Sequence, residues 1–167
     1  MKMRKAWWWA FVLFLSGCTS YQPKASEDTA RLRFVTYQRG TASIHVWDAD
    51  SPQDPKLLVV QVVGNLLSPI SSKLDMMGEP EEGAANATEI LLPANRNLRI
   101  SVSATWTTPE RKLIRCLVAF DFNAKRDGQF EVQYRTIEAG TRCLAASFEL
   151  TQGDGGKVTR TIIGDLP

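Results

Sequence analysis

Histidine is almost absent from this chain of 167 residues, which contains only His45. A Ser-His-Asp triad built on a nucleophile turn is not indicated, because no G-x-S-x-G motif occurs. The H-E-x-x-H zinc motif is also missing. We therefore expect no catalytic residues, no metal ligands and no cofactor, and we do not expect an enzyme. His45 falls between Ile44 and Val46 in a predicted strand, where a structural or surface role is the simplest interpretation.

Long apolar runs are scarce at the N-terminus, where one run covers only Ala6–Leu15. A transmembrane helix needs about 20 apolar residues, so this run is the size of a signal-peptide core. Basic residues precede it and small residues follow it, namely Lys2, Arg4, Lys5, Ser16 and Gly17. This order of basic, apolar and small residues predicts a secretory signal over residues 1–17.

The end of this signal, Leu15-Ser16-Gly17-Cys18, resembles the lipobox of bacterial lipoproteins. The resemblance implies that diacylglycerol is joined to Cys18, which becomes the mature N-terminus and attaches the protein to a membrane. The alternative is an ordinary cleaved signal beside an incidental cysteine. Thr19 follows Cys18, and the lack of Asp there favours the outer membrane by analogy with Gram-negative sorting. Residues 18–30 are polar and predict a short tether that holds a periplasmic domain, residues 31–167, near its membrane.

Excess charge of either sign is also missing once the signal is removed. The whole chain has 20 basic and 18 acidic residues, and removal of Lys2, Arg4 and Lys5 leaves 17 against 18. A net charge near −1 does not support nucleic-acid binding.

Cysteine is rare, with three residues in the chain. If Cys18 carries lipid, Cys116 and Cys143 remain, and we predict that they pair in an oxidising periplasm. A redox-active pair or metal ligands are the alternatives, although the spacing is not C-x-x-C. Closure of this loop of roughly 27 residues predicts about 3–4 kcal/mol of stabilisation.

Alternating apolar residues from Arg31 onward predict short β-strands. Leu98–Trp106 gives the cleanest period-2 pattern, and Lys56–Gly64 is the apolar run of a strand buried on both faces. Leu32 and Phe34 alternate with Arg31 and Arg33 at the start of this pattern. We predict an all-β fold, an antiparallel β-sandwich of immunoglobulin or transthyretin type with seven or eight strands.

The predicted disulfide does not fit strict alternation of inward and outward residues. Cys116 shares a face with Phe120, whereas Cys143 lies opposite the face formed by Leu144 and Phe148. The pairing therefore requires Cys143 to lie at a strand start or at a bulge.

The segment 65–88 is the sizeable part that is not predicted to be β. Ser68-Pro69 predicts one or two helical turns that Gly78 ends. We interpret the rest as a surface excursion or a functional loop. Four glutamates in and directly after this segment predict a solvated acidic loop, with a hard cation as the alternative, and they are Glu79, Glu81, Glu82 and Glu89. The acidic stretch 48–54 predicts a turn rather than a calcium loop, whose glycine and closing glutamate are missing.

Four segments carry a wider resemblance: LRISVSATW, IRCLVAFDF, FEVQY and RCLAASFEL. Together they resemble small proteobacterial outer-membrane lipoproteins with a disulfide-linked β-sandwich domain. A weaker likeness in size, anchor and β pattern is to the transthyretin-like lipoprotein of type VI secretion systems.

The wider resemblance implies no particular activity. The lipid anchor together with the missing catalytic groups predicts a lipid-anchored, non-enzymatic interaction or structural module. We expect it to dock on another envelope protein or on a secretion-type assembly. The alternative is a binding or inhibitor module that acts against a periplasmic or host hydrolase through the loop 65–88.

Overall fold

The computed structural model describes residues 27–37, 41–50, 58–63, 74–107, 112–137 and 142–165. The predicted signal peptide, Cys18 and most of the predicted tether lie outside these residues. Within them, no helix is long and apolar enough to span a membrane. Apart from residues 27–30, the described residues belong to the predicted domain, residues 31–167.

Strands account for most of the described chain. They are β1 (Thr29–Thr36), β2 (Thr41–Asp48), β3 (Leu58–Val63), β4 (Asn86–Pro93), β5 (Asn97–Thr107), β6 (Leu113–Asn123), β7 (Gln129–Ile137), β8 (Arg142–Gln152) and β9 (Val158–Asp165). The one short 3-10 turn in this part of the chain is η2 (Asp154–Gly156), at the tip of the β8–β9 hairpin. Residues 74–78 of the predicted helical turns form no helix, and residues 68–73 lie outside the description.

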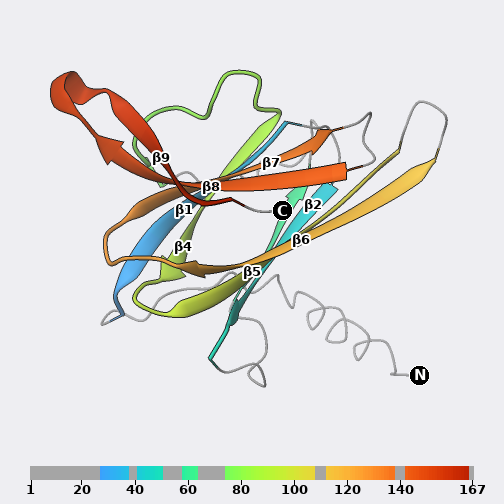
Figure 1. Ribbon diagram of the computed structural model, residues 1–167, viewed down its shortest axis with the longest axis horizontal. Coiled ribbons are helices and arrows are strands. Elements are labelled where there is room, and N and C mark those ends of the chain that lie inside the picture. The colour runs from blue at the N-terminus through green and yellow to red at the C-terminus, as the bar shows by residue number, and fades with distance from the viewer. Residues whose placement is uncertain are drawn as a thin grey trace, which may run out of the picture.

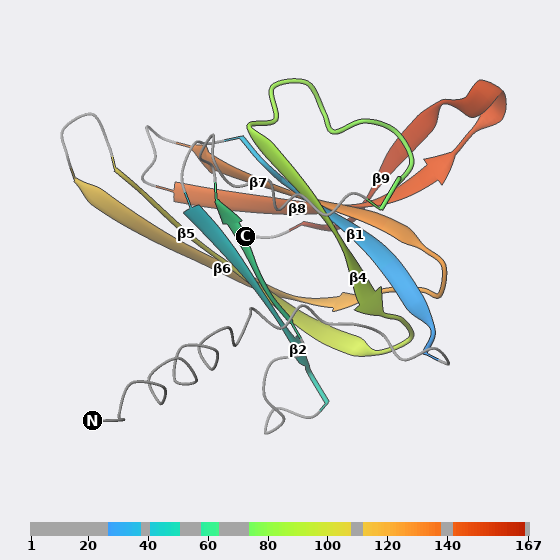
Figure 2. The same cartoon turned by 180° about the vertical axis from the view of Figure 1, so that it is seen from behind.

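The strands form two sheets that lie against each other (Figures 1 and 2). The five-stranded sheet has the order β4-β1-β7-β8-β9, and the four-stranded sheet has the order β3-β2-β5-β6. The predicted all-β sandwich is confirmed, with nine strands instead of seven or eight. Neighbours are antiparallel except β1 and β7, which run parallel. These two strands are distant in sequence, so no hairpin turn requires them to be antiparallel.

The core lies between the sheets and follows the predicted alternation. Leu32 and Phe34 of β1 are fully buried there, as are Ile100 and Val102 of β5. Phe122 of β6 meets Phe130 of β7 edge to face across the core, with ring centroids 5.1 Å apart. Edge-to-face packing adds a modest gain to the burial of the two rings.

Strand β8 directs its more apolar face away from the other sheet. Leu144 lies opposite Arg135 and Phe148 lies opposite Glu131 on β7. Directly paired residues share a face, so Leu144 and Phe148 lie on the outer face with these charged residues. Ala145 and Ser147 lie opposite the core residues Tyr134 and Val132 of β7 and face inward instead.

The predicted disulfide can form because β8 directs the face that carries Cys143 toward the other sheet. Cys143 is the second residue of β8, so the predicted position at a strand start is confirmed and no bulge is needed there. The Cys116–Cys143 disulfide joins β6 to β8, one strand from each sheet, with the Cα atoms 6.3 Å apart. The hydroxyl of Tyr134 donates a hydrogen bond to the Sγ of Cys143 at 3.1 Å.

The outer face of the five-stranded sheet holds a second, smaller buried layer. Val35, Met76 and Leu150 are buried but do not belong to the main core cluster. Met76 comes from the segment 74–85, which precedes β4 and appears in green in Figure 1. This segment covers part of the sheet that would otherwise face solvent, and so encloses polar side chains.

Candidate functional site

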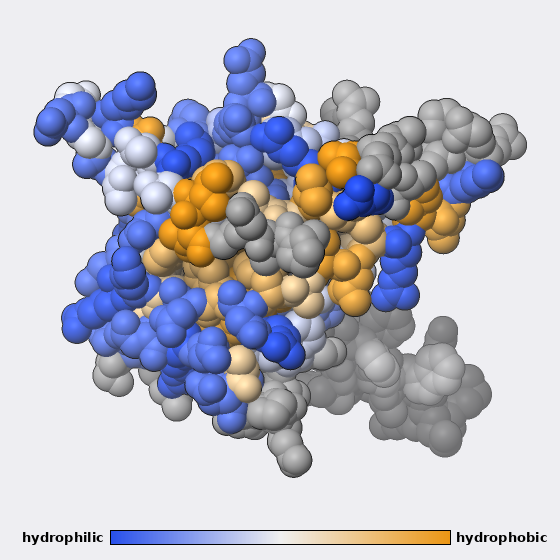
Figure 3. Space-filling view, viewed as in Figure 1, coloured by the Kyte–Doolittle hydropathy of each residue, from blue (hydrophilic) through white to orange (hydrophobic). Residues whose placement is uncertain are grey.

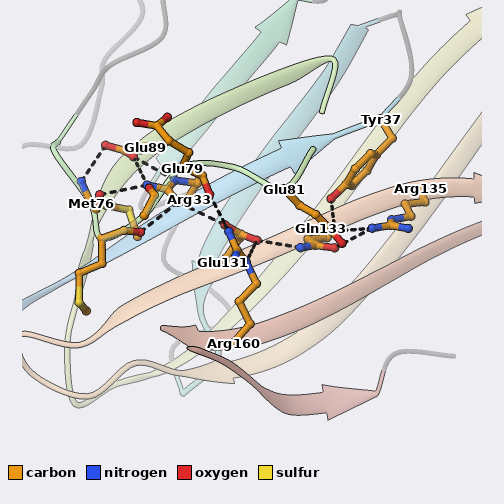
Figure 4. A network of polar contacts seen from close by, with 12 residues as sticks. Arg33, Tyr37, Met76, Glu79, Glu81, Glu89, Glu131, Gln133, Arg135 and Arg160 are labelled. Atoms are coloured by element: carbon orange, nitrogen blue, oxygen red, sulfur yellow. Dashed lines mark hydrogen bonds and ion pairs between the residues drawn. The ribbon is translucent and has the colours of Figure 1, made fainter. Parts of the chain in front are cut away.

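A row of charged side chains crosses the outer face of the five-stranded sheet. Arg33 of β1 lies opposite Glu89 of β4 and, on its other side, opposite Glu131 of β7. Arg160 of β9 reaches the same place from the sheet edge. We call these four residues the charged cluster, and Figure 4 shows Arg33 between the two carboxylates.

Arg33 has 2% of its surface exposed and is bound by both neighbouring carboxylates. Its Nε and Nη2 donate to Oε1 of Glu89 at 3.0 and 2.8 Å, and its Nη1 donates to Oε2 of Glu131 at 3.3 Å. A buried charge is tolerated only when it is paired and hydrogen-bonded in this way. Arg33 therefore lies off the main core and is nevertheless buried, because the segment 74–85 covers it.

The same guanidinium also holds three successive backbone carbonyls. Nη2 donates to the carbonyls of Met76 and Gly78 at 3.2 and 2.7 Å, and Nη1 donates to that of Met77 at 3.3 Å. Five N–H donors in a fixed fork make arginine suited to this task. Arg33 thus binds the backbone of the segment 74–85 to the sheet.

Glu131 is fully buried, and both of its carboxylate oxygens accept hydrogen bonds. Its Oε1 accepts from Nε2 of Gln133 at 2.8 Å and from Nε of Arg160 at 2.9 Å. Its Oε2 accepts from Nη2 of Arg160 at 3.2 Å as well as from Arg33. Two arginines therefore balance this carboxylate and Glu89.

Further hydrogen bonds tie the segment to the sheet. The amides of Leu74 and Met76 donate to Oε2 of Glu89 at 2.5 and 3.4 Å. The amide of Met77 donates to Oε1 of Gln129 at 2.7 Å. Arg160 donates to the Glu79 carbonyl, also at 2.7 Å. Most of the segment's first six residues are thus held by side chains of the sheet.

The network ends at a solvent-exposed group of three residues. Glu81 accepts from the Tyr37 hydroxyl at 2.7 Å and from Nη2 of Arg135 at 2.6 Å. The Arg135 guanidinium lies 4.0 Å from the centre of the Tyr37 ring, in cation–π geometry. Arg135 also donates to Gln133, which links this group to Glu131.

The surroundings lower the pKa of two acidic residues, Glu89 and Glu81. Burial works to raise the pKa of Glu89, but hydrogen bonds from Arg33 and from the Leu74 and Met76 amides outweigh it and hold this pKa below its usual value. The hydrogen bond from Tyr37 lowers the pKa of Glu81. Carboxylates that are ionised and already paired are suited to fixing a backbone segment, and less to exchanging protons with a substrate.

Of the four acidic residues Glu79, Glu81, Glu82 and Glu89, only Glu89 is not solvated, which corrects that prediction. Glu89 belongs to β4 and is buried in the charged cluster, whereas Glu79, Glu81 and Glu82 are exposed, and Glu81 also binds Tyr37. In the described part of the chain, no three His, Cys, Asp or Glu residues gather as a metal site would require.

His45 lies elsewhere, on the outer face of the four-stranded sheet. Its ring stacks on that of Trp47 at 5.6 Å between centroids, and both residues are partly exposed. Oδ1 of Asp48 accepts from the Asp50 amide at 3.0 Å, as in the predicted turn. Residues 51–54 of that stretch and Cys18, the predicted lipidation residue, lie outside the described residues.

Sequence reasoning missed the charged cluster, although a weak signal for it exists. Arg33 stands between Leu32 and Phe34 on β1, and Glu131 stands between Phe130 and Val132 on β7. Opposite charges at alternate positions of two strands are typical of cross-strand pairs. The sequence does not show that these strands are neighbours, nor that a segment covers them.

No protein-family model matches the chain, and no curated protein matches it. The structure establishes a small, disulfide-linked β domain.

Proposed function

We propose that this chain is a lipid-anchored envelope protein that acts as a non-enzymatic interaction module. The lipobox-like Leu15–Cys18 supports attachment of acyl chains to Cys18, export to the outer membrane and a domain on its periplasmic side. Two or more acyl chains would make attachment lasting. The partner is another envelope protein or a secretion-type assembly near that membrane.

The clamped segment 74–85 is the observation that carries this proposal. Buried Arg33 and Glu89 hold its backbone, while Glu79 and Glu82 remain exposed. A surface loop that is already ordered loses little conformational entropy when it binds. The buried charged cluster holds this segment in a single conformation, which is the property that a recognition loop requires.

The chemistry of the segment indicates the partner's surface. Glu79, Glu81 and Glu82 are exposed and lie within four residues of one another. A surface that carries lysine or arginine would be attracted to this acidic tip, which favours fast association and correct orientation.

Site-specific photo-crosslinking in intact cells tests the proposal. A photoreactive residue at position 82 should give one discrete adduct with a membrane-associated protein. The same residue at Lys157, on the exposed β8–β9 hairpin tip, is the matched control and should not. Cys18→Ser should abolish labelling by radioactive palmitate and reduce the adduct. Normal labelling of Cys18→Ser would contradict the anchor, and no adduct from position 82 would contradict the docking role.

The clamped segment also favours the binding or inhibitor alternative, since inhibitors use preorganised loops. The adduct discriminates the two, because an inhibitor would capture a soluble hydrolase. Deletion of the loop is a poor test of either function, because it would uncover Arg33. Glu82→Lys changes the exposed tip alone and should weaken capture without lowering stability.

A further inference from the structure

The large exposed apolar side chains of the described residues all lie on two edge strands. Leu113 and Leu117 of β6 are 73% and 66% exposed, and Ile162 and Ile163 of β9 are 59% and 42% exposed. Figure 3 shows apolar surface gathered on this side of the sandwich. Apolar groups collected on one side of a soluble domain indicate an interaction surface.

The two edges differ in how open they are to another strand. The pairing of β9 with β8 shifts register between Ser147 and Phe148, and β9 contains Gly164. Bulges of this kind protect an edge from pairing with another chain. In contrast, β6 has 11 residues in unbroken register with β5, with no proline or glycine. Among the described strands, none pairs with its second edge.

The outer face of β6 is complementary to itself. Arg115 and Asp121 lie on this face, one on either side of Leu117 and Ala119, and all four are exposed. We propose that β6 pairs antiparallel with β6 of a second copy of this chain, so that two four-stranded sheets join edge to edge.

The positions of the charges determine the register. In an antiparallel pair, alternate residues of an edge strand direct their N–H and C=O groups outward, so a two-fold pairing is centred on one residue. Centring on Val118, the middle of β6, pairs the whole strand. Arg115 then lies opposite Asp121 of the second copy, and Leu117 lies opposite Ala119, twice each. Centring on Leu117 would place Arg115 opposite Ala119 instead.

Asp121 can bind a second positively charged side chain. Arg99 of β5 donates to its two oxygens at 2.8 and 3.1 Å, yet the Asp121 side chain stays 52% exposed. A carboxylate has about four lone-pair positions, so Arg115 of the second copy can bind the free side. The pairing would also cover Leu117, whose exposure otherwise has no structural reason. This inference does not depend on the lipid anchor.

Charge reversal tests the pairing on the full chain purified in detergent, with molar mass measured by light scattering across a concentration series. Wild type should dimerise. Arg115→Asp or Asp121→Arg should weaken dimerisation more than about tenfold, because each places like charges opposite each other twice. The double variant R115D/D121R should restore it, and Lys157→Asp should leave it unchanged. A wild type that stays monomeric, or an unaffected R115D dimer, would overturn the proposal.

Introduced cysteines test the register. Directly opposite residues bring their Cα atoms within disulfide range, whereas diagonal ones do not. L117C/A119C should therefore form a disulfide-linked dimer in air. Leu117→Cys alone should not, and an efficient dimer from it would reject centring on Val118. A disulfide-linked dimer in neither variant would reject edge pairing.

Discussion

Arg160 of β9 forms a two-point ion pair with Glu131 of β7 across the intervening strand β8. Nε lies 2.9 Å from Oε1 and Nη2 lies 3.2 Å from Oε2. The hydrogen bond to Glu131 raises the pKa of Arg160 above its usual value. The pair joins the edge strand to the buried cluster, and through the Glu79 carbonyl it also joins the segment 74–85.

Removal of Arg33 should be the most damaging single change in this cluster. Arg33→Met leaves Glu89 and Glu131 buried beside a neutral side chain, and breaking a buried pair in this way costs about 3–5 kcal/mol. Urea unfolding measures the loss. Arg99→Met removes the exposed partner of Asp121 and serves as the control, because an exposed pair contributes little. Equal effects of the two variants would show that burial of the cluster is energetically unimportant.

Acid should weaken the fold through Glu89. The pKa of Glu89 is lower in the folded chain than its ordinary value of 4.5, so the unfolded chain binds more protons in this range. Its contribution is complete above about pH 4.5 and is lost as the pH falls through the folded pKa. Urea unfolding between pH 7 and pH 3 should show a shallower decline for Glu89→Gln than for wild type. Parallel profiles would contradict this role of Glu89.

High pH should also destabilise the fold, through ionisation of Tyr134. Burial raises the pKa of Tyr134 to about 12, above its ordinary value of 10.0. A raised folded pKa gives stability that is complete below pH 10 and is lost as the pH rises toward 12. The ultraviolet difference between wild type and Tyr134→Phe should titrate near pH 12. A difference that titrates near pH 10 would mean that the hydroxyl is not buried against Cys143.

The β-sandwich could be predicted from the sequence because apolar residues at alternate positions indicate the buried face of a strand. Leu98, Ile100 and Val102 of β5 alternate with polar residues and are buried as predicted. The pairing of Cys116 with Cys143 was predicted from the number of cysteines and from the compartment that the signal sequence predicts. Both inferences rest on local pattern or on counting, and neither requires knowledge of which strands are neighbours.

Two features of the outer sheet face were not accessible in this way. Alternation places Arg33 off the core face, which is correct, but burial there depends on the distant segment 74–85. In β8 the face of Leu144 and Phe148 is the more apolar, yet Cys143 faces the other sheet. A second buried layer makes both faces of a strand partly apolar, so hydropathy alone cannot assign its inner face.

Loss of the disulfide should destabilise the domain by about 3–4 kcal/mol, because the bridge constrains a long loop of the unfolded chain. Cys116 and Cys143 are 27 residues apart. Wild type should unfold at lower urea concentration after reduction, and C116S/C143S should match the reduced protein. The double variant should itself be insensitive to reductant. Unchanged wild-type unfolding after verified reduction would contradict the prediction.

Two glycines of the clamped segment give a matched test of its contact with β9. Gly78 and Gly83 both have positive φ, at 66° and 86°, so alanine at either position should cost about 1 kcal/mol of backbone strain. A Cβ at Gly78 would lie 3.1 Å from Cγ2 of Val158, whereas at Gly83 it would meet nothing.

Gly78→Ala should therefore lower the free energy of unfolding more than Gly83→Ala does. Val158→Ala in the same chain should recover the excess, which appears as a favourable coupling in a double-mutant cycle. Gly83→Ala with Val158→Ala should show no coupling. Equal costs for the two glycines, with no coupling to Val158, would mean that the segment does not pack on β9. The same cycle followed by hydrogen exchange would show whether the amides of Leu74 and Met76 lose protection together with that packing.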